Sequence, residues 1–187
     1  AGLLSGLSDS ELFRLVNVAS SRAVPGTLAF RTALLEAYYL HPANKELSSI
    51  RQQMDRCLIY REGDRVSAQD LVEQMNHIFS NELGRVQLGL LGDESPPPIV
   101  LKSGKDFIRV IEMEAQGDPS TLSLRSLVRA FNSLLSLRET RKRFLPLQCA
   151  EWCEIYYGLS LTEATELARD GWLEEKDLES VIDFGGW

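Results

Sequence analysis

The chain of 187 residues has few of the features that mark secreted or membrane proteins. Its only cysteines are Cys57, Cys149 and Cys153, and an odd, sparse set argues against a disulfide framework and for a reducing compartment. No apolar run approaches the roughly 18 residues that a membrane span needs. The first residues lack a basic segment followed by a long apolar core, so we expect no signal peptide. These absences favour a soluble, cytoplasmic protein.

The sequence also lacks the motifs of common catalytic and cofactor sites. It contains neither of the glycine-rich phosphate-binding loops, GxxxxGKS/T and GxGxxG, and no serine in a nucleophile-elbow context. Cys149 and Cys153 stand four residues apart on a predicted helix and could supply two zinc ligands, but zinc sites usually need at least three protein ligands. The other soft ligands, Cys57, His41 and His77, are distant in sequence. We therefore predict no catalytic residue, no metal and no cofactor.

What the sequence does contain is a repeated helix-start signature. Four segments of the form S-x-x-D/E, beginning at Ser8, Ser67, Ser103 and Ser160, precede runs with helical apolar spacing. In such a segment the serine hydroxyl accepts a hydrogen bond from the backbone N–H three residues later. The acidic side chain at that later position accepts a hydrogen bond from the backbone N–H of the serine. Four signatures of this kind predict an all-α protein.

Hydrophobic periodicity extends this signal to a compact orthogonal bundle of about eight or nine short helices. The expected helices span residues 9–21, 27–40, 43–60, 68–83, 104–116, 119–142, 147–157, 161–170 and 174–183. The residues predicted to form the core are Leu34, Tyr38, Leu71, Phe79, Leu127 and Phe131.

One long, irregular connection rich in glycine and proline, residues 84–102, interrupts the helices. It includes three consecutive prolines, which fix the backbone and remove hydrogen-bond donors. Residues 99–101 could form a short strand or an extended apolar anchor. We interpret residues 1–187 as a single all-α domain, with a possible sub-domain boundary in 84–102. That boundary would separate a four-helix part, 1–83, from a C-terminal helical part, 103–187.

The net charge of −7 is unevenly distributed along the chain. Residues 146–187 hold ten acids against Arg169 and Lys176, whereas the preceding residues are close to neutral. A local run of basic residues ends the expected helix 119–142. The basic and acidic parts could pair with each other or face solvent, or each could form a polarised docking surface.

Two aromatic residues close the chain behind its acidic stretch, and aromatic side chains dominate the energetics of many interfaces. They could equally fold back onto their own domain. With the basic run they form the candidate partner-binding residues: Arg138, Arg141, Lys142, Arg143, Phe184 and Trp187.

The leading hypothesis is a non-enzymatic protein–protein interaction module, such as an adaptor, a regulatory subunit or an assembly factor, whose partner is another protein. The first alternative is a nucleic-acid-associated factor that uses the basic end of helix 119–142. The second is an enzyme whose site is dispersed across several helices. The sequence does not indicate an oligomeric state.

Overall fold

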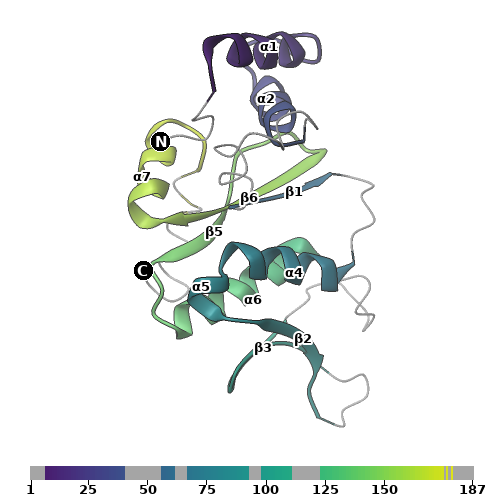
Figure 1. The fold of residues 1–187 in the computed structure, drawn as a ribbon, viewed down its shortest axis with the longest axis vertical. Coiled ribbons are helices and arrows are strands. Elements are labelled where there is room, and N and C mark those ends of the chain that lie inside the picture. Colours follow the sequence, from purple (N-terminus) through teal and green to yellow (C-terminus); the bar gives the residue numbers. More distant parts are fainter. Residues whose placement is uncertain are drawn as a thin grey trace.

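The computed structural model describes residues 7–40, 56–61, 67–92, 98–110 and 123–174, together with Lys176 and Leu178. This part of the chain has an α+β fold, so the prediction of an all-α bundle is wrong (Figure 1). The helices are α1 (Asp9–Ser20), α2 (Leu28–Leu40), α4 (Ala68–Ile78), α5 (Ser80–Leu83), α6 (Leu124–Leu137) and α7 (Leu161–Arg169). The strands are β1 (Cys57–Arg61), β2 (Val86–Leu90), β3 (Ile99–Ser103), β4 (Asp106–Arg109), β5 (Lys142–Pro146) and β6 (Cys153–Ser160).

The elements stack as alternating layers of helices and sheets (Figure 1). Sheet A has the antiparallel order β1-β6-β5, and sheet B has the antiparallel order β2-β3-β4. Helices α2 and α7 cover one face of sheet A, with α1 packed against α2. Helices α4 and α6 lie between the other face of sheet A and sheet B, so this pair of helices contributes to both interfaces.

The central strand β6 is buried on both of its faces. Ile155, Tyr157 and Leu159 belong to the core cluster beneath α2 and α7, whereas Tyr156 belongs to the cluster formed with α4 and α6. A strand covered on both sides has a nearly continuous apolar sequence instead of a period of two. For this reason the predicted helix 147–157 is wrong: its residues form the connection after β5 and the first half of β6.

The cluster between the two sheets is organised around three phenylalanine rings. Phe144 of β5 meets Phe79 edge to face at 4.7 Å and Phe131 of α6 at 5.7 Å between ring centres. Such geometry aligns the positive ring edge with the negative ring face. The core prediction is confirmed, because its six members are all buried: Leu34, Tyr38, Leu71, Phe79, Leu127 and Phe131.

Two asparagine side chains attach the helical layer to the sheets on either side of it. Asn76 of α4 donates to the carbonyl oxygen of Val86 at 2.6 Å and accepts its N–H at 2.8 Å. Asn132 of α6 makes the same pair of bonds, both 2.8 Å long, to Phe144. Each side-chain amide therefore takes the place of a neighbouring strand, for Val86 of β2 in one case and Phe144 of β5 in the other. Without it, the backbone N–H and carbonyl of that residue would lose these hydrogen bonds.

Three of the four serine signatures cap helices as predicted. Ser8 and Ser160 form complete capping boxes at α1 and α7, and the Ser67 hydroxyl accepts the N–H of Asp70 at the start of α4. These helices confirm the predictions for 9–21, 68–83 and 161–170, except that Phe79 separates α4 from α5. Helix α2 likewise confirms 27–40.

The signature at Ser103 has a different structure, because it closes the hairpin between β3 and β4. Ser103 pairs with Asp106 across a two-residue turn, and Gly104 has a φ of 60°, as the first residue of a type II′ turn requires. The Ser103 hydroxyl donates to the carbonyl oxygen of Leu83 at 2.7 Å. The predicted helix 104–116 is therefore wrong through residue 110, and its remainder lies outside the described residues.

Residues 84–102, predicted to be an irregular connection, instead contribute two paired strands. Strands β2 and β3 are antiparallel, with Leu88 opposite Leu101, so residues 99–101 form a strand. Residues 93–97 lie outside the described part. Residues from both sides of this segment, including Val72 and Phe131, share one core cluster, and the sub-domain boundary stays a prediction.

Of the two remaining predicted helices, 43–60 is wrong where the structure describes it, and 174–183 is hardly described. Within 43–60, residues 57–60 belong to strand β1, while residues 41–55 lie outside the described part. Helix 174–183 falls almost wholly outside it.

Glycine at position 158 lets α4 approach the sheet closely. A Cβ added to Gly158 would lie 3.0 Å from Ile78 Cγ2 and 3.1 Å from Phe79 Cζ. We expect Gly158→Ala to lower the free energy of unfolding by about 1–3 kcal/mol, the usual cost of overpacking a core. Urea denaturation measures this change.

Gly89→Ala is the matched control, because Gly89 also lies in a strand and its added Cβ would only reach Val100 Cγ2 at 3.9 Å. Neither glycine has a positive φ. Alanine suits a strand interior better than glycine does, so this variant should be as stable as the parent chain or slightly more so. Equal losses in the two variants would contradict the packing explanation.

Candidate functional site

The basic run predicted to dock a partner does not continue a helix. Helix α6 ends at Leu137 in a Schellman motif, in which the Thr140 N–H bonds to the Leu135 carbonyl and the Glu139 N–H bonds to the Ser136 carbonyl. Glu139 takes the left-handed conformation, with a φ of 55°. The prediction of a helix over 119–142 is thus wrong after residue 137 and at Ser123, which is the extended N-cap of α6, while residues 119–122 lie outside the described part.

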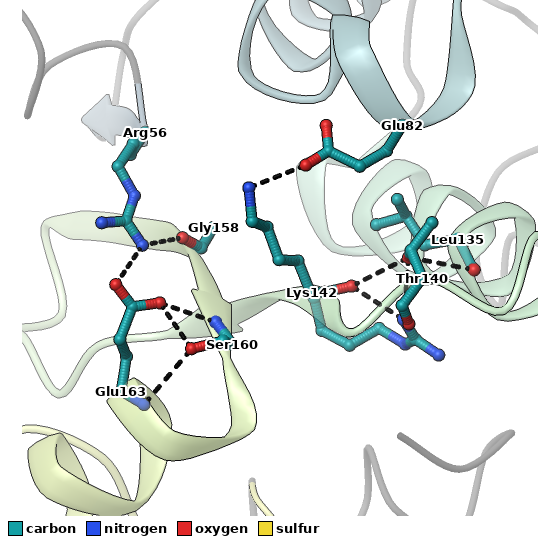
Figure 2. Close-up of polar contacts among 9 residues, drawn as sticks. Arg56, Glu82, Leu135, Thr140, Lys142, Gly158, Ser160 and Glu163 are labelled. Carbon is teal, nitrogen blue, oxygen red and sulfur yellow. Dashed lines mark hydrogen bonds and ion pairs between the residues drawn. The ribbon is translucent and has the colours of Figure 1, made fainter.

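Two of the basic residues form ion pairs within the protein. The Arg138 guanidinium pairs with Asp106 at 3.0 Å and donates to the Ser103 carbonyl at 3.2 Å, which joins the end of α6 to the β3–β4 hairpin. Lys142, the first residue of β5, pairs with Glu82 of α5 at 2.7 Å (Figure 2). Both side chains thus connect elements of the fold.

Arg143 is a structural residue, with only 3% of its surface exposed. Its guanidinium donates to the backbone carbonyls of Thr140 and Lys142, both at 2.7 Å. Burial lowers the pKa of Arg143, yet an arginine keeps its charge because its ordinary pKa is so high. The side chain therefore holds the turn between α6 and β5.

Arg141 alone of the four basic residues is exposed without a hydrogen bond or ion pair to any described residue. Phe184 and Trp187 lie outside the described part of the chain. The structure brings the four basic residues together around one turn, and it does not place them against the two aromatic residues. The docking role of the whole group stays a prediction.

A second set of polar contacts fastens α7 to sheet A (Figure 2). The Arg56 guanidinium pairs with Glu163 at 2.8 Å, donates to the Gly158 carbonyl at 2.9 Å, and lies 5.3 Å from the centre of the Tyr157 ring. Glu163 also accepts the N–H of Ser160 at 2.9 Å. Partial burial raises the pKa of Glu163, but the hydrogen bonds from Ser160 and Arg56 outweigh it and hold this pKa below the usual value.

The cysteine thiols have the surroundings of structural residues. None of the three cysteines forms a disulfide. The thiol of Cys149 donates to the carbonyl of Cys153 at 2.6 Å, and burial raises the pKa of both Cys57 and Cys149. Because the thiolate is the reactive form, neither thiol is activated as a nucleophile.

The most prominent surface feature that the sequence analysis missed is a group of exposed apolar side chains at the N-terminal helical hairpin. Among the described residues, five of the eleven large apolar side chains that are exposed lie between residues 12 and 28, so the exposed apolar surface of this part of the chain concentrates in the hairpin. They are Leu12, Phe13, Val18, Val24 and Leu28. Phe13 is 68% exposed. The sequence signal for this exposure was its spacing of two residues from Leu15, which places Phe13 on the side of α1 away from the buried stripe.

Neither a membrane helix nor a metal cluster is present in the part of the chain that the structure describes. No helix there has the length and apolar character needed to cross a bilayer. No three histidine, cysteine or acidic side chains gather there into a possible metal site. Comparison with models of protein families, with curated proteins and with solved structures gave no match.

The contacts of Glu163 predict a pH-dependent loss of stability in Glu163→Gln. At pH 7 we expect a loss of about 0.5–1 kcal/mol, the scale of a partly exposed ion pair. Since the folded pKa is lowered, the contribution of the carboxylate is complete above its unfolded pKa and disappears as the pH falls through the folded value. Urea denaturation at pH 7, 5 and 3 measures the difference between parent and variant.

Glu11→Gln is the control for this experiment. Glu11 belongs to the same kind of capping box, with Ser8, but its pKa is lowered mainly by the serine and only slightly by Arg14. We expect a smaller loss than in Glu163→Gln at pH 7. A loss in Glu163→Gln that stays constant from pH 7 to pH 3 would refute the role assigned to the charge.

The surroundings of Arg143 and Arg141 predict that the same substitution lowers the stability of the protein at position 143 and leaves it nearly unchanged at position 141. Arg143→Met removes the donor of two turn carbonyls and should cost about 1–3 kcal/mol. Arg141→Met changes an exposed side chain and should stay within about 0.5 kcal/mol of the parent. Both values come from chemical denaturation at pH 7. If the two variants were equally stable, Arg143 would not hold the turn.

Proposed function

We propose that this chain is a non-enzymatic protein-interaction module that binds a partner protein through the exposed side of α1, with Phe13 as the aromatic anchor. The observation that carries the proposal is the exposure of Phe13, Leu12 and three further apolar side chains within one helical hairpin. Scattered apolar residues are common on protein surfaces, but a concentration of them in one hairpin favours an interaction site.

The position of α1 supports this assignment. Figure 1 shows α1 at one end of the molecule, on the far side of α2 from sheet A. Only Leu15 and Ala19 of this helix are fully buried. A rotation of about 100° per residue sets Phe13 roughly opposite Leu15. The helix therefore packs through one stripe and leaves Phe13, on the opposite side, available to an apolar pocket on a partner.

The internal pairing of the basic residues also favours an apolar anchor over a charged one. Arg138 and Lys142 already pair with Asp106 and Glu82, so a partner would have to displace these acids to use them. Arg141 is available to steer association through its charge. The affinity itself would come chiefly from Phe13, because central aromatic residues carry most of the binding energy in many interfaces.

A cross-linking experiment tests the proposal directly. A photoreactive phenylalanine analogue at position 13 should link the chain to its partner in an extract of the source cells, and mass spectrometry would identify the linked protein. In a titration with that purified partner, Phe13→Ala should weaken binding by about 30-fold or more, the effect of a 2 kcal/mol hot spot. Its melting temperature should equal that of the parent.

Phe107→Ala is the matched control, because Phe107 is also exposed, at 51%, but lies in sheet B. It should bind the partner with the parent affinity. Parent affinity in Phe13→Ala, or an equal loss in the two variants, would refute α1 as the docking element.

A further inference from the structure

The outer face of sheet B combines one exposed aromatic ring with several cations. Paired residues in an antiparallel sheet share a face, and the register pairs Gln87 with Lys102, Lys102 with Phe107, and Val100 with Arg109. The opposite face carries Leu88, Leu101 and Ile108, which pack toward α4 and α6. Phe107, Lys102 and Arg109 consequently lie on the face of sheet B away from α4 and α6, the face on which Val100 is buried.

Each of these three side chains is exposed. Phe107 has 51% of its surface in contact with solvent, and Lys102 and Arg109 are also exposed, as is Lys105 in the adjoining turn. An exposed phenylalanine on a sheet face does not contribute its full apolar burial to stability. On this face the ring lies next to cations, and that combination is what the proposal below uses.

The cations of this face differ from most basic residues described above. The side chains of Lys102, Lys105 and Arg109 make no hydrogen bond or ion pair with any residue that the structure describes, whereas those of Arg56, Arg138 and Lys142 each pair with an acid. No acidic residue lies on the outer face of the three strands. The face is thus locally positive in a chain whose net charge is −7, and it complements an anionic ligand.

From this arrangement we propose that the outer face of sheet B binds single-stranded nucleic acid, with a base stacked on Phe107 and phosphates contacting Lys102, Lys105 and Arg109. Strand neighbours lie about 4.8 Å apart, and alternate residues along a strand lie about 6.7 Å apart. Lys102 and Arg109 therefore flank Phe107 closely enough to reach the phosphates of the nucleotide stacked on it and of the next one.

A single strand fits this face better than a duplex or an acidic protein does. Aromatic side chains on sheet faces stack on bases that are unstacked and accessible, as in other single-strand-binding sheets, and a duplex keeps its base faces covered. An acidic peptide satisfies the cations but offers no flat π surface for the ring. This surface is separate from α1, so its test does not depend on the proposed partner protein.

Fluorescence anisotropy with a labelled 12-nucleotide oligo(dT) or oligo(U) tests the proposal. We expect binding at 50 mM salt that falls with a slope of about −2 in a plot of log K against log salt, since each of three phosphate contacts contributes about −0.7. Phe107→Ala should weaken binding by about 5- to 160-fold, the range for losing one stacked base. Phe107→Tyr, which keeps the ring, should bind like the parent.

Further variants separate the charges from the ring. Lys102→Gln combined with Arg109→Gln should reduce the salt slope to about −0.7, with one phosphate contact left. Phe13→Ala and Arg141→Gln remove an exposed ring and an exposed cation from other surfaces and should leave binding unchanged. Melting temperatures establish that each variant is folded.

Three outcomes would overturn the proposal. The first is that no binding is detected at 50 mM salt with the chain at about 100 µM. This concentration is on the order of the dissociation constant of the weakest non-specific binding. The second is equal binding by the parent and Phe107→Ala. The third is that a glutamate-rich 12-residue peptide binds more tightly than the oligonucleotide and loses affinity in the same variants, which would assign the face to an acidic protein segment.

Discussion

The middle layer, helices α4 and α6, packs against one sheet on each of its two sides, and most of the fold depends on this double contact. Helices α4 and α6 supply apolar side chains to sheet A and sheet B through one core cluster. Asn76 and Asn132 complete the backbone hydrogen bonding of a strand on either side. Because a buried N–H or carbonyl without a partner costs as much as a lost hydrogen bond, these two amides fix the position of each helix against its strand.

The same constraint explains how the charged residues are used. Elements that meet at the rim of the layers are joined by ion pairs: Arg56 connects the start of β1 to α7, Arg138 connects α6 to β4, and Lys142 connects β5 to α5. Each pair is partly exposed and contributes modestly to stability, but together they orient the connections. None of these three ion pairs involves the outer side of α1 or the outer side of sheet B, the two surfaces on which the proposals above rest.

Sequence patterns located several helices but also predicted helices where the structure has strands, for identifiable reasons. Serine caps and amphipathic spacing located α1, α4 and α7, since these signals are local. Strand β6 escaped because burial on both faces removes its alternation, and the hairpin at Gly104 escaped because its S-x-x-D pattern matches a capping box. The end of α6 gave no signal, since Glu139 stands where glycine usually ends a helix. Of the candidate site, the sequence identified basic residues but could not show that most of them have internal partners.

The topology of sheet A also has a consequence for the order of folding. Strands β5 and β6 are joined by a short connection, with Pro146 opposite Tyr156, whereas β1 places Cys57 opposite Tyr157, about 100 positions later in the chain. Loop-closure entropy grows with the logarithm of the loop length, so closing the longer loop costs about 2 kcal/mol more than closing one of ten residues. The β5–β6 hairpin therefore has a lower entropic cost of closure than the pairing of β1 with β6, which favours its earlier formation. A large share of such long-range pairing makes folding slow for a chain of this size.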